Sequence, residues 1–177
     1  MATIIKDRNI ETDPWQRLEL NADGTLPAAL PSGDVIVPLA MWQRQREALL
    51  ARPGRIGVWL NSDEEPATIA GDLGFFAVVA VNFPKFVDGR GYSIARLLRE
   101  RYGWKGELRA IGDIIRDHLF FLSSCGFNAF ALRAAEDPRE ALSAFGDFSE
   151  TYQSSVERPL PLFRRRQAAA RGGAERS

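Results

Sequence analysis

The residues best suited to chemistry gather in one short stretch, Asn82 to Ser93, with the sequence NFPKFVDGRGYS. Its glycines, Gly89 and Gly91, permit backbone conformations that let main-chain N–H groups approach a ligand. Ser93 is a suitable N-cap for a helix that begins at Ile94, and the first N–H groups of a helix carry partial positive charge. The stretch therefore offers hydrogen-bond donors to a negatively charged group.

Full positive charges lie in the same stretch. Lys85 and Arg90 supply them, and the planar guanidinium of Arg90 can donate two parallel hydrogen bonds. We therefore predict a site for a small anion such as phosphate, sulfate, sulfite or carboxylate. The predicted anion-binding residues are Lys85, Arg90, Gly91, Tyr92 and Ser93. The alternative is a capped turn in which Asp88 and Arg90 form a local salt bridge.

Further polar residues follow the other apolar runs of the chain. Parallel α/β folds bind ligands at the carboxyl ends of their strands, in the loops that lead to the helices. We take Asp88, Arg109 and Asp113 as second-rank candidates for the anion site. The same rule also selects Asn61, Ser62, Asp63, Asn82, Gly112 and Arg133. None of these residues is an evident nucleophile, so no catalytic residue is assigned.

Five apolar runs alternate with helical stretches after residue 33. The predicted strands cover residues 34–40, 55–60, 76–81, 106–112 and 128–133, and the predicted helices cover 41–54, 62–75, 93–104, 113–126 and 137–152. This alternation predicts an α/β fold with a parallel sheet of about five strand–helix units. Two closures fit, an incomplete barrel or an open doubly wound sheet, and the short units favour the barrel.

Two of the predicted helices carry specific expectations. In the helix over 113–126, Asp113 is a suitable N-cap and Gly126 a C-terminal stop. In the helix over 93–104, the periodicity places Ile94, Leu97, Leu98 and Tyr102 on a buried face. The same periodicity leaves Arg96, Arg99 and Glu100 on the solvated side.

The chain divides into three parts. Residues 1–30 form a polar preface in which ATIIKD (2–7) and QRLEL (16–20) can pair as a hairpin. Residues 31–155 form the α/β domain. Residues 156–177 form a basic tail that we expect to be disordered, since from Arg158 onward it has six arginines and one glutamate.

Composition excludes several classes of function. The formal net charge is zero and the tail is basic, so the remaining body is acidic and no nucleic-acid-binding face is expected. Cys125 is the only cysteine and His118 the only histidine, which argues against a disulfide, a zinc or iron–sulfur site, or any other metal site. We expect Cys125 to be a buried inert thiol and His118 a core or interface residue.

Targeting and cofactor signals are also missing. The start, MATIIKDRNIETD, lacks the layout of a secretory signal, and no apolar run is long enough to span a bilayer, so we expect a cytoplasmic protein without a membrane partner. Neither G-x-G-x-x-G nor G-x-x-x-x-G-K-[ST] occurs, so the sequence names no cofactor.

A longer block resembles a known family. Residues 82–132 contain FPKF-DGRGYS-ARLLRERYG, followed by GELRA-GD and CGF-AF, and resemble the core of domain-of-unknown-function family 934, an uncharacterised bacterial group. The resemblance extends over most of residues 30–150. Members are commonly described as probable oxidoreductases involved in sulfite reduction, and the loop with the predicted anion site is their signature. One departure is His118, where the family is expected to have glutamine.

The resemblance implies a place in assimilatory sulfite reduction, either as an accessory protein or as an oxidoreductase, with sulfite reductase as the suspected partner. A single cysteine cannot hold an iron–sulfur cluster, which favours the accessory role. Two alternatives stay open: a docking module for sulfite reductase without a small ligand, and an enzyme that binds a flavin or a phosphorylated substrate. An incomplete barrel has exposed sheet edges, so we also predict a homodimer.

Overall fold

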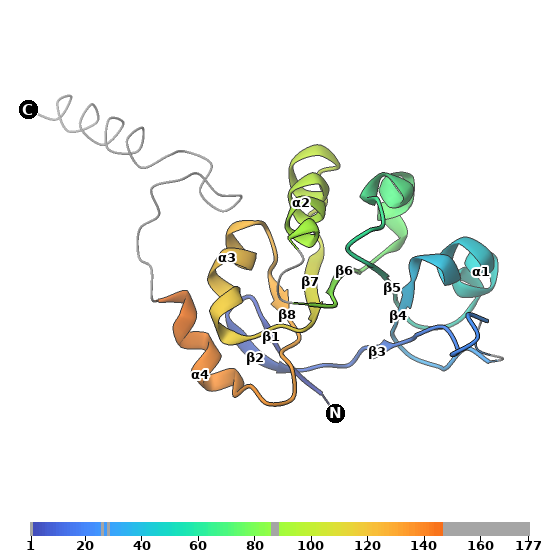
Figure 1. The fold of residues 1–177 in the computed structure, drawn as a ribbon. Coiled ribbons are helices and arrows are strands. Elements are labelled where there is room, and N and C mark those ends of the chain that lie inside the picture. The colour runs from blue at the N-terminus through green and yellow to red at the C-terminus, as the bar shows by residue number, and fades with distance from the viewer. Residues whose placement is uncertain (1, 26, 28, 86–88, 147–177) are drawn as a thin grey trace, which may run out of the picture.

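One mixed sheet organises the chain. The computed structural model describes residues 2–25, 27, 29–85 and 89–146, and within them it has an eight-stranded sheet with the order β2-β1-β8-β7-β6-β5-β4-β3 (Figure 1). The strands are β1 (Thr3–Lys6), β2 (Asn9–Thr12), β3 (Gln16–Arg17), β4 (Val35–Pro38), β5 (Ile56–Leu60), β6 (Val78–Phe83), β7 (Glu107–Gly112) and β8 (Ala129–Phe130).

Helices follow the strands of the parallel part. They are α1 (Leu39–Ala51), the 3-10 helix η1 (Pro66–Phe75), α2 (Arg90–Arg96) continued by the π-helical η2 (Leu97–Arg101), the 3-10 turn η3 (Arg116–His118), α3 (Leu119–Ser124), α4 (Pro138–Leu142) and the 3-10 turn η4 (Ser143–Phe145). No helix in the described part of the chain has the length and apolar character needed to cross a membrane.

The five predicted strand–helix units are confirmed, but the sheet is not purely parallel. Strands β4 to β8 pair in parallel and in chain order. The N-terminal segment then adds one strand at one edge and two at the other. Strand β3 pairs in parallel with β4, whereas β1 runs antiparallel to both β8 and β2. The expected pairing of residues 2–7 with 16–20 is wrong, because β1 takes β2 as its hairpin partner.

The sheet is curled into a half-barrel with its helices on one face. Alternate residues of β6 show the two faces, since Val79 and Val81 join the large core that includes residues of α1, η1, α2, α3 and α4. Val78 and Ala80 face the other way, into a small cluster that contains no helix residue. We call this cluster the inner cluster and this side of the sheet the inner face. The incomplete barrel is therefore the observed closure, and the doubly wound alternative is wrong, because that arrangement needs helices on both faces.

A three-residue link crosses the open side of the half-barrel. Strands β2 and β3 lie at opposite edges of the sheet, yet only Asp13, Pro14 and Trp15 separate them in the chain. Figure 1 shows this blue segment running from β2 to β3. Trp15 packs on the inner cluster. The inner face is therefore lined by the sheet and spanned by the link.

The start of α2 differs from the prediction. The helix begins at Arg90 with Gly89 as its N-cap, so Ser93 lies inside the helix and does not cap it. Four residues further on, at Leu97, the helix changes to a π turn in which the N–H of Tyr102 donates to the carbonyl of Leu97 at 3.0 Å. A π turn breaks the 3.6-residue period within residues 97–101, and Tyr102 directly beyond it still packs against the core as expected.

The predicted helix over 113–126 is shorter than expected. Asp113 is not its N-cap, because its N–H donates to the carbonyl of Phe83 at 2.8 Å and the first helical turn begins at Arg116. The stop at Gly126 is confirmed, since this glycine has a φ of 110°, a conformation that side chains disfavour.

Candidate functional site

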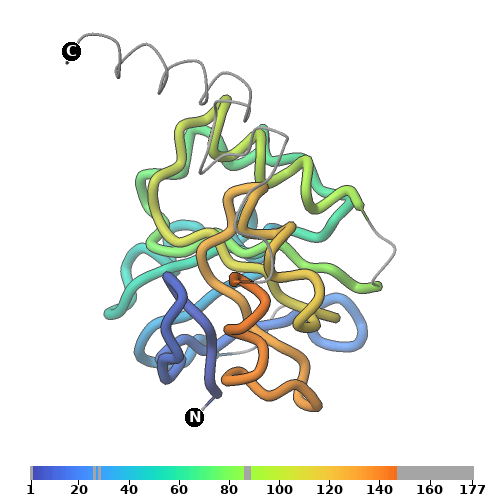
Figure 2. Tube along the Cα trace, turned by 90° about the vertical axis from the view of Figure 1, so that its left-hand side faces the viewer, coloured from blue at the N-terminus to red at the C-terminus, as the bar shows by residue number. Residues whose placement is uncertain are grey.

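A groove lies between η1 and the helix formed by α2 and η2. We call it the outer groove; it has a volume of about 610 Å³. Its lining residues are Ser62, Asp63, Glu64, Glu65, Pro66, Ala67, Arg90, Ser93, Ile94, Leu97, Arg101 and Tyr102. Figures 1 and 2 show the two helices on the same side of the sheet, where η1 and η2 contact each other; η1 follows β5 in the chain and α2 follows β6. The carboxyl ends of the strands, which both helices follow, are the edge at which parallel α/β folds keep their ligand sites.

Side chains that follow β5 and β6 meet at the end of the outer groove where α2 begins. Nη2 of Arg90 donates to Oγ of Ser62 at 3.2 Å, which connects the start of α2 to the loop after β5. Beside this pair, Nδ2 of Asn82 donates to Oδ1 of Asn61 at 3.0 Å. These contacts fix the loop after β5 against the end of β6.

The two walls of the outer groove carry opposite charges. Asp63, Glu64 and Glu65 precede η1 on one wall, and Arg90 and Arg101 lie at the two ends of the helical wall. Glu64 is half-buried, its Oε2 accepts the N–H of Asn61 at 2.6 Å, and burial raises its pKa. Such a site can hold charged groups by ion pairing and hydrogen bonding.

The structure brings together two of the five predicted anion-binding residues. Arg90 and Ser93 are three residues apart on one helix face, and both line the outer groove. Lys85 is exposed after the end of β6 and does not line the groove. Asp88 lies outside the described residues.

Gly91 and Tyr92 point away from the outer groove. Gly91 is buried, and a Cβ at this position would lie 2.6 Å from the ring of Phe83. The ring of Tyr92 packs between Phe83 and Phe121, with centroid distances of 5.2 and 4.9 Å. Burial raises the pKa of Tyr92, so its hydroxyl stays protonated at neutral pH. The structure thus places both residues in the packing of α2 against the sheet.

The second-rank candidates do not join the outer groove. Arg109 lies in the middle of β7 on the inner face, 2% exposed, and its guanidinium contacts the carboxylates of Glu107 and Asp13. Asp113 lies at the carboxyl edge, but it does not line the groove, and its Oδ1 pairs with Nη1 of Arg133 at 3.5 Å. Arg109 lies within its strand and not at the strand end, and its surroundings in the sequence do not specify which face of the sheet its side chain occupies.

A second hollow lies on the inner face, near the carboxyl ends of β5, β6 and β7, and we call it the mouth of the half-barrel. It has a volume of about 160 Å³, and its lining residues are Arg17, Glu19, Trp59, Asn82, Ile111 and Gly112. Trp59 is fixed by a hydrogen bond from Nε1 to the carbonyl of Leu18 at 2.9 Å. Arg17 and Glu19 form an exposed ion pair at 2.9 Å. Sequence reasoning did not select these two residues, because residues 16–20 were expected to pair with residues 2–7, whereas β3 pairs with β4.

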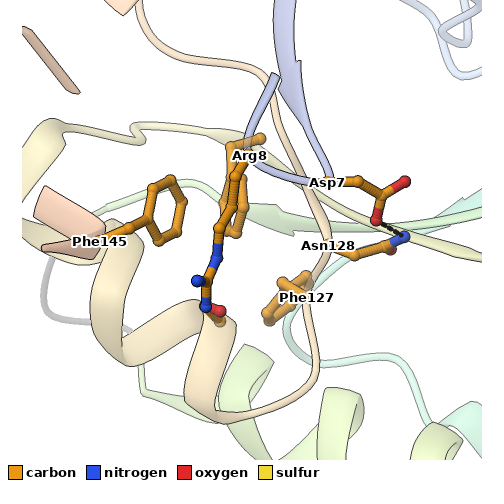
Figure 3. A pocket seen from close by; sticks show the side chains of 7 residues that line it. Asp7, Arg8, Phe127, Asn128 and Phe145 are labelled. Carbon is orange, nitrogen blue, oxygen red and sulfur yellow. Dashed lines mark hydrogen bonds between the residues drawn. The ribbon is translucent and has the colours of Figure 1, made fainter. Parts of the chain in front are cut away.

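A third pocket lies at the opposite edge of the sheet (Figure 3). It has a volume of about 270 Å³ and includes three phenylalanine rings, and the Arg8 guanidinium lies over the ring of Phe145 at 5.6 Å. Asn128 donates from Nδ2 to Oδ1 of Asp7 at 3.0 Å, which ties the first hairpin turn to the start of β8. Because this is the amino edge, its contacts are expected to serve stability and not chemistry.

His118 and Cys125 are both buried, and among the described residues no three His, Cys, Asp or Glu side chains could together hold a metal ion. Nδ1 of His118 accepts the N–H of Ile115 at 3.4 Å. Burial lowers the pKa of His118 below its ordinary 6.5, and this effect outweighs the nearby carboxylates of Asp113, Asp117 and Glu136.

The pKa of His118 predicts a pH-dependent stability. The folded protein binds fewer protons at this imidazole than the unfolded chain, so its contribution to stability is present above pH 6.5 and is lost as the pH falls. We expect the wild type to lose stability relative to His118→Gln between pH 7.5 and 5.5 in urea unfolding. A constant difference between the two proteins across this range would contradict the prediction.

The fold and the groove define the class of protein: a curled, mostly parallel α/β half-barrel with a charged groove at the carboxyl edge of its strands. The chain belongs to the family described as "Bacterial protein of unknown function (DUF934)", whose model matches residues 57–163. No curated protein matches it. The matched range contains both walls of the outer groove, whereas Arg17 and Glu19 of the mouth lie outside it.

Proposed function

We propose that this chain is an accessory protein of assimilatory sulfite reduction that holds a small anion in the outer groove, at Arg90 and Ser93. The role in sulfite reduction is supported by the resemblance of residues 82–132 to a family that is commonly associated with that process. The accessory role is supported by the single cysteine and by the lack of a dinucleotide fingerprint.

The observation that carries the proposal is the position of Arg90. Its guanidinium reaches the hydroxyl of Ser62 across the outer groove at the carboxyl edge, and Ser93 lines the same groove. A guanidinium has five N–H donors in a planar fork, and this geometry suits the oxygens of sulfite, sulfate or phosphate. Two serine hydroxyls can add donors to the same oxygens.

Replacing Arg90 by alanine should weaken the binding of a small anion by about tenfold or more, because hydrogen bonds to charged groups contribute about 1.5–3 kcal/mol. Isothermal titration calorimetry with sulfite, sulfate and phosphate measures this effect. Arg96→Ala is the matched control, since Arg96 is exposed on the same helix, does not line the groove and pairs with Glu100. Absence of binding to the wild type, or equal binding to the Arg90 variant, would refute the anion site.

One observation favours docking onto sulfite reductase as a second candidate. Phe121 is 53% exposed and packs edge-on against Tyr92, so an apolar ring lies next to the signature loop. Exposed aromatic rings are common at the centre of protein interfaces. Co-purification with sulfite reductase that is insensitive to added anion, together with no anion binding, would favour this role over the anion site.

A further inference from the structure

We propose that the outer groove selects a small dipolar ion, with an acidic group held by Arg90 and an ammonium group held by the opposite wall. The chemical class is an amino acid or an aminoalkyl sulfonate. This inference rests on the proposed anion site and adds the part of the ligand that the anion site does not explain.

The charge of the opposite wall is the first observation. Asp63 and Glu65 are exposed and Glu64 is half-buried, and all three line the groove directly before η1. They directly follow Ser62 in the chain, and the hydroxyl of Ser62 contacts Arg90 at 3.2 Å, so the acidic segment begins at the end of the groove that holds Arg90. Carboxylates this close repel a simple anion, whereas they attract an ammonium group on the same ligand.

The middle of the groove is the second observation. On the helical wall, between Arg90 and Arg101, the lining includes Ile94, which is buried, and Leu97, which is 37% exposed, and on the opposite wall the buried Pro66 follows the acidic residues. Apolar side chains next to both charge types can contact a short carbon chain that joins two opposite charges. The volume of about 610 Å³ also lies in the usual range for small-molecule sites and exceeds what an inorganic oxyanion fills.

A pair of sulfonates tests the inference directly. Ethanesulfonate and 2-aminoethanesulfonate (taurine) share the same anionic group and chain length and differ in the ammonium group. We expect taurine to bind the wild-type protein about fivefold more tightly in calorimetric titration at low ionic strength, which is the size of one favourable exposed charge pair. Arg90→Ala should weaken the binding of both compounds.

Neutralising the acidic wall should have opposite effects on the two probes. In the Asp63→Asn, Glu65→Gln double variant we expect weaker binding of taurine and tighter binding of ethanesulfonate, because the same carboxylates attract the ammonium group and repel the sulfonate. Glu100→Gln is the control, since Glu100 is exposed on η2 and does not line the groove. A variant that only unfolded would lose both probes and would not show this crossed change.

The outcomes separate the inference from the proposed function. If sulfite and ethanesulfonate bind at Arg90 and taurine binds no more tightly, the dipolar ligand is refuted and the anion site stands. If neither sulfonate nor sulfite binds, both are refuted. A crossed change in the double variant supports the dipolar ligand.

Discussion

Replacing Arg99 by alanine should lower the free energy of unfolding by about 3 kcal/mol, because the variant loses several hydrogen bonds to a charged group and leaves buried carbonyls without that donor. The guanidinium of Arg99 donates to the carbonyls of Gly126, Trp104 and Gly106 at 2.7–2.9 Å and to Oδ1 of Asn128 at 3.2 Å. These acceptors lie directly before β7 and β8, so one side chain holds the segments that lead into both strands.

Urea unfolding of three variants measures the contribution of this contact. Arg96→Ala is the matched control, since Arg96 is exposed on the same helix and its pairing with Glu100 at 3.9 Å should contribute at most about 0.5 kcal/mol. Arg99→Lys keeps the charge but lacks the planar fork, so we expect it to recover only part of the loss. An Arg99→Ala variant as stable as Arg96→Ala would show that the contact contributes little.

The role of Arg99 also shows where sequence reasoning reached its limit. Helical periodicity places Arg99 on the solvated side and Leu97 in the core, but Leu97 is 37% exposed and Arg99 is directed to the sheet. Arg99 lies inside the π turn at residues 97–101, which no local signal announces and in which the 3.6-residue period does not hold. A pattern based on 3.6 residues per turn is reliable only while the helix keeps that period.

The strand–helix order could be predicted because it depends on local information. Continuous apolar runs such as RIGVWL indicate strands covered on both faces, and the structure confirms five of them in parallel order. The edges could not be predicted in the same way. Strands β2 and β3 are short and exposed, and their pairing depends on contacts with strands far along the chain.

The candidate site was predictable in position but not in detail. The strand-end rule selected Arg90, Ser93 and Ser62, and all three line the outer groove. Gly91 and Tyr92 were expected at the same site, but both pack against Phe83 and neither lines the groove. The face that a helical residue occupies depends on where the helix begins. A start at Arg90 in place of Ile94 turns Gly91 into the core. Of the acidic wall the rule selected Asp63 but not Glu64 and Glu65, since the loop after β5 was considered only for its first three residues.

Replacing Asp13 by alanine should lower the free energy of unfolding by about 3–5 kcal/mol, because it leaves a buried positive charge without part of its compensation. Oδ2 of Asp13 accepts from Nη1 of Arg109 at 2.8 Å, and the two side chains are only 10% and 3% exposed. Arg109 also pairs with Glu107 at 2.7 Å, and Glu107 pairs with Lys6 at 3.1 Å. Two acids and two bases thus balance each other on the inner face.

The same contact holds the link across the open side of the half-barrel, so two causes of instability must be separated. Glu11→Ala is the control for the first hairpin, since Glu11 is exposed on β2. The Asp13→Ala, Arg109→Met double variant no longer has the buried positive charge of Arg109, and Glu107 still has its ion pair with Lys6. If the charge is the main cause, this variant should regain most of the lost stability in urea unfolding. If it regains none, the loss of stability comes from the link of residues 13–15, and the main role of Asp13 is to hold this link across the open side of the half-barrel.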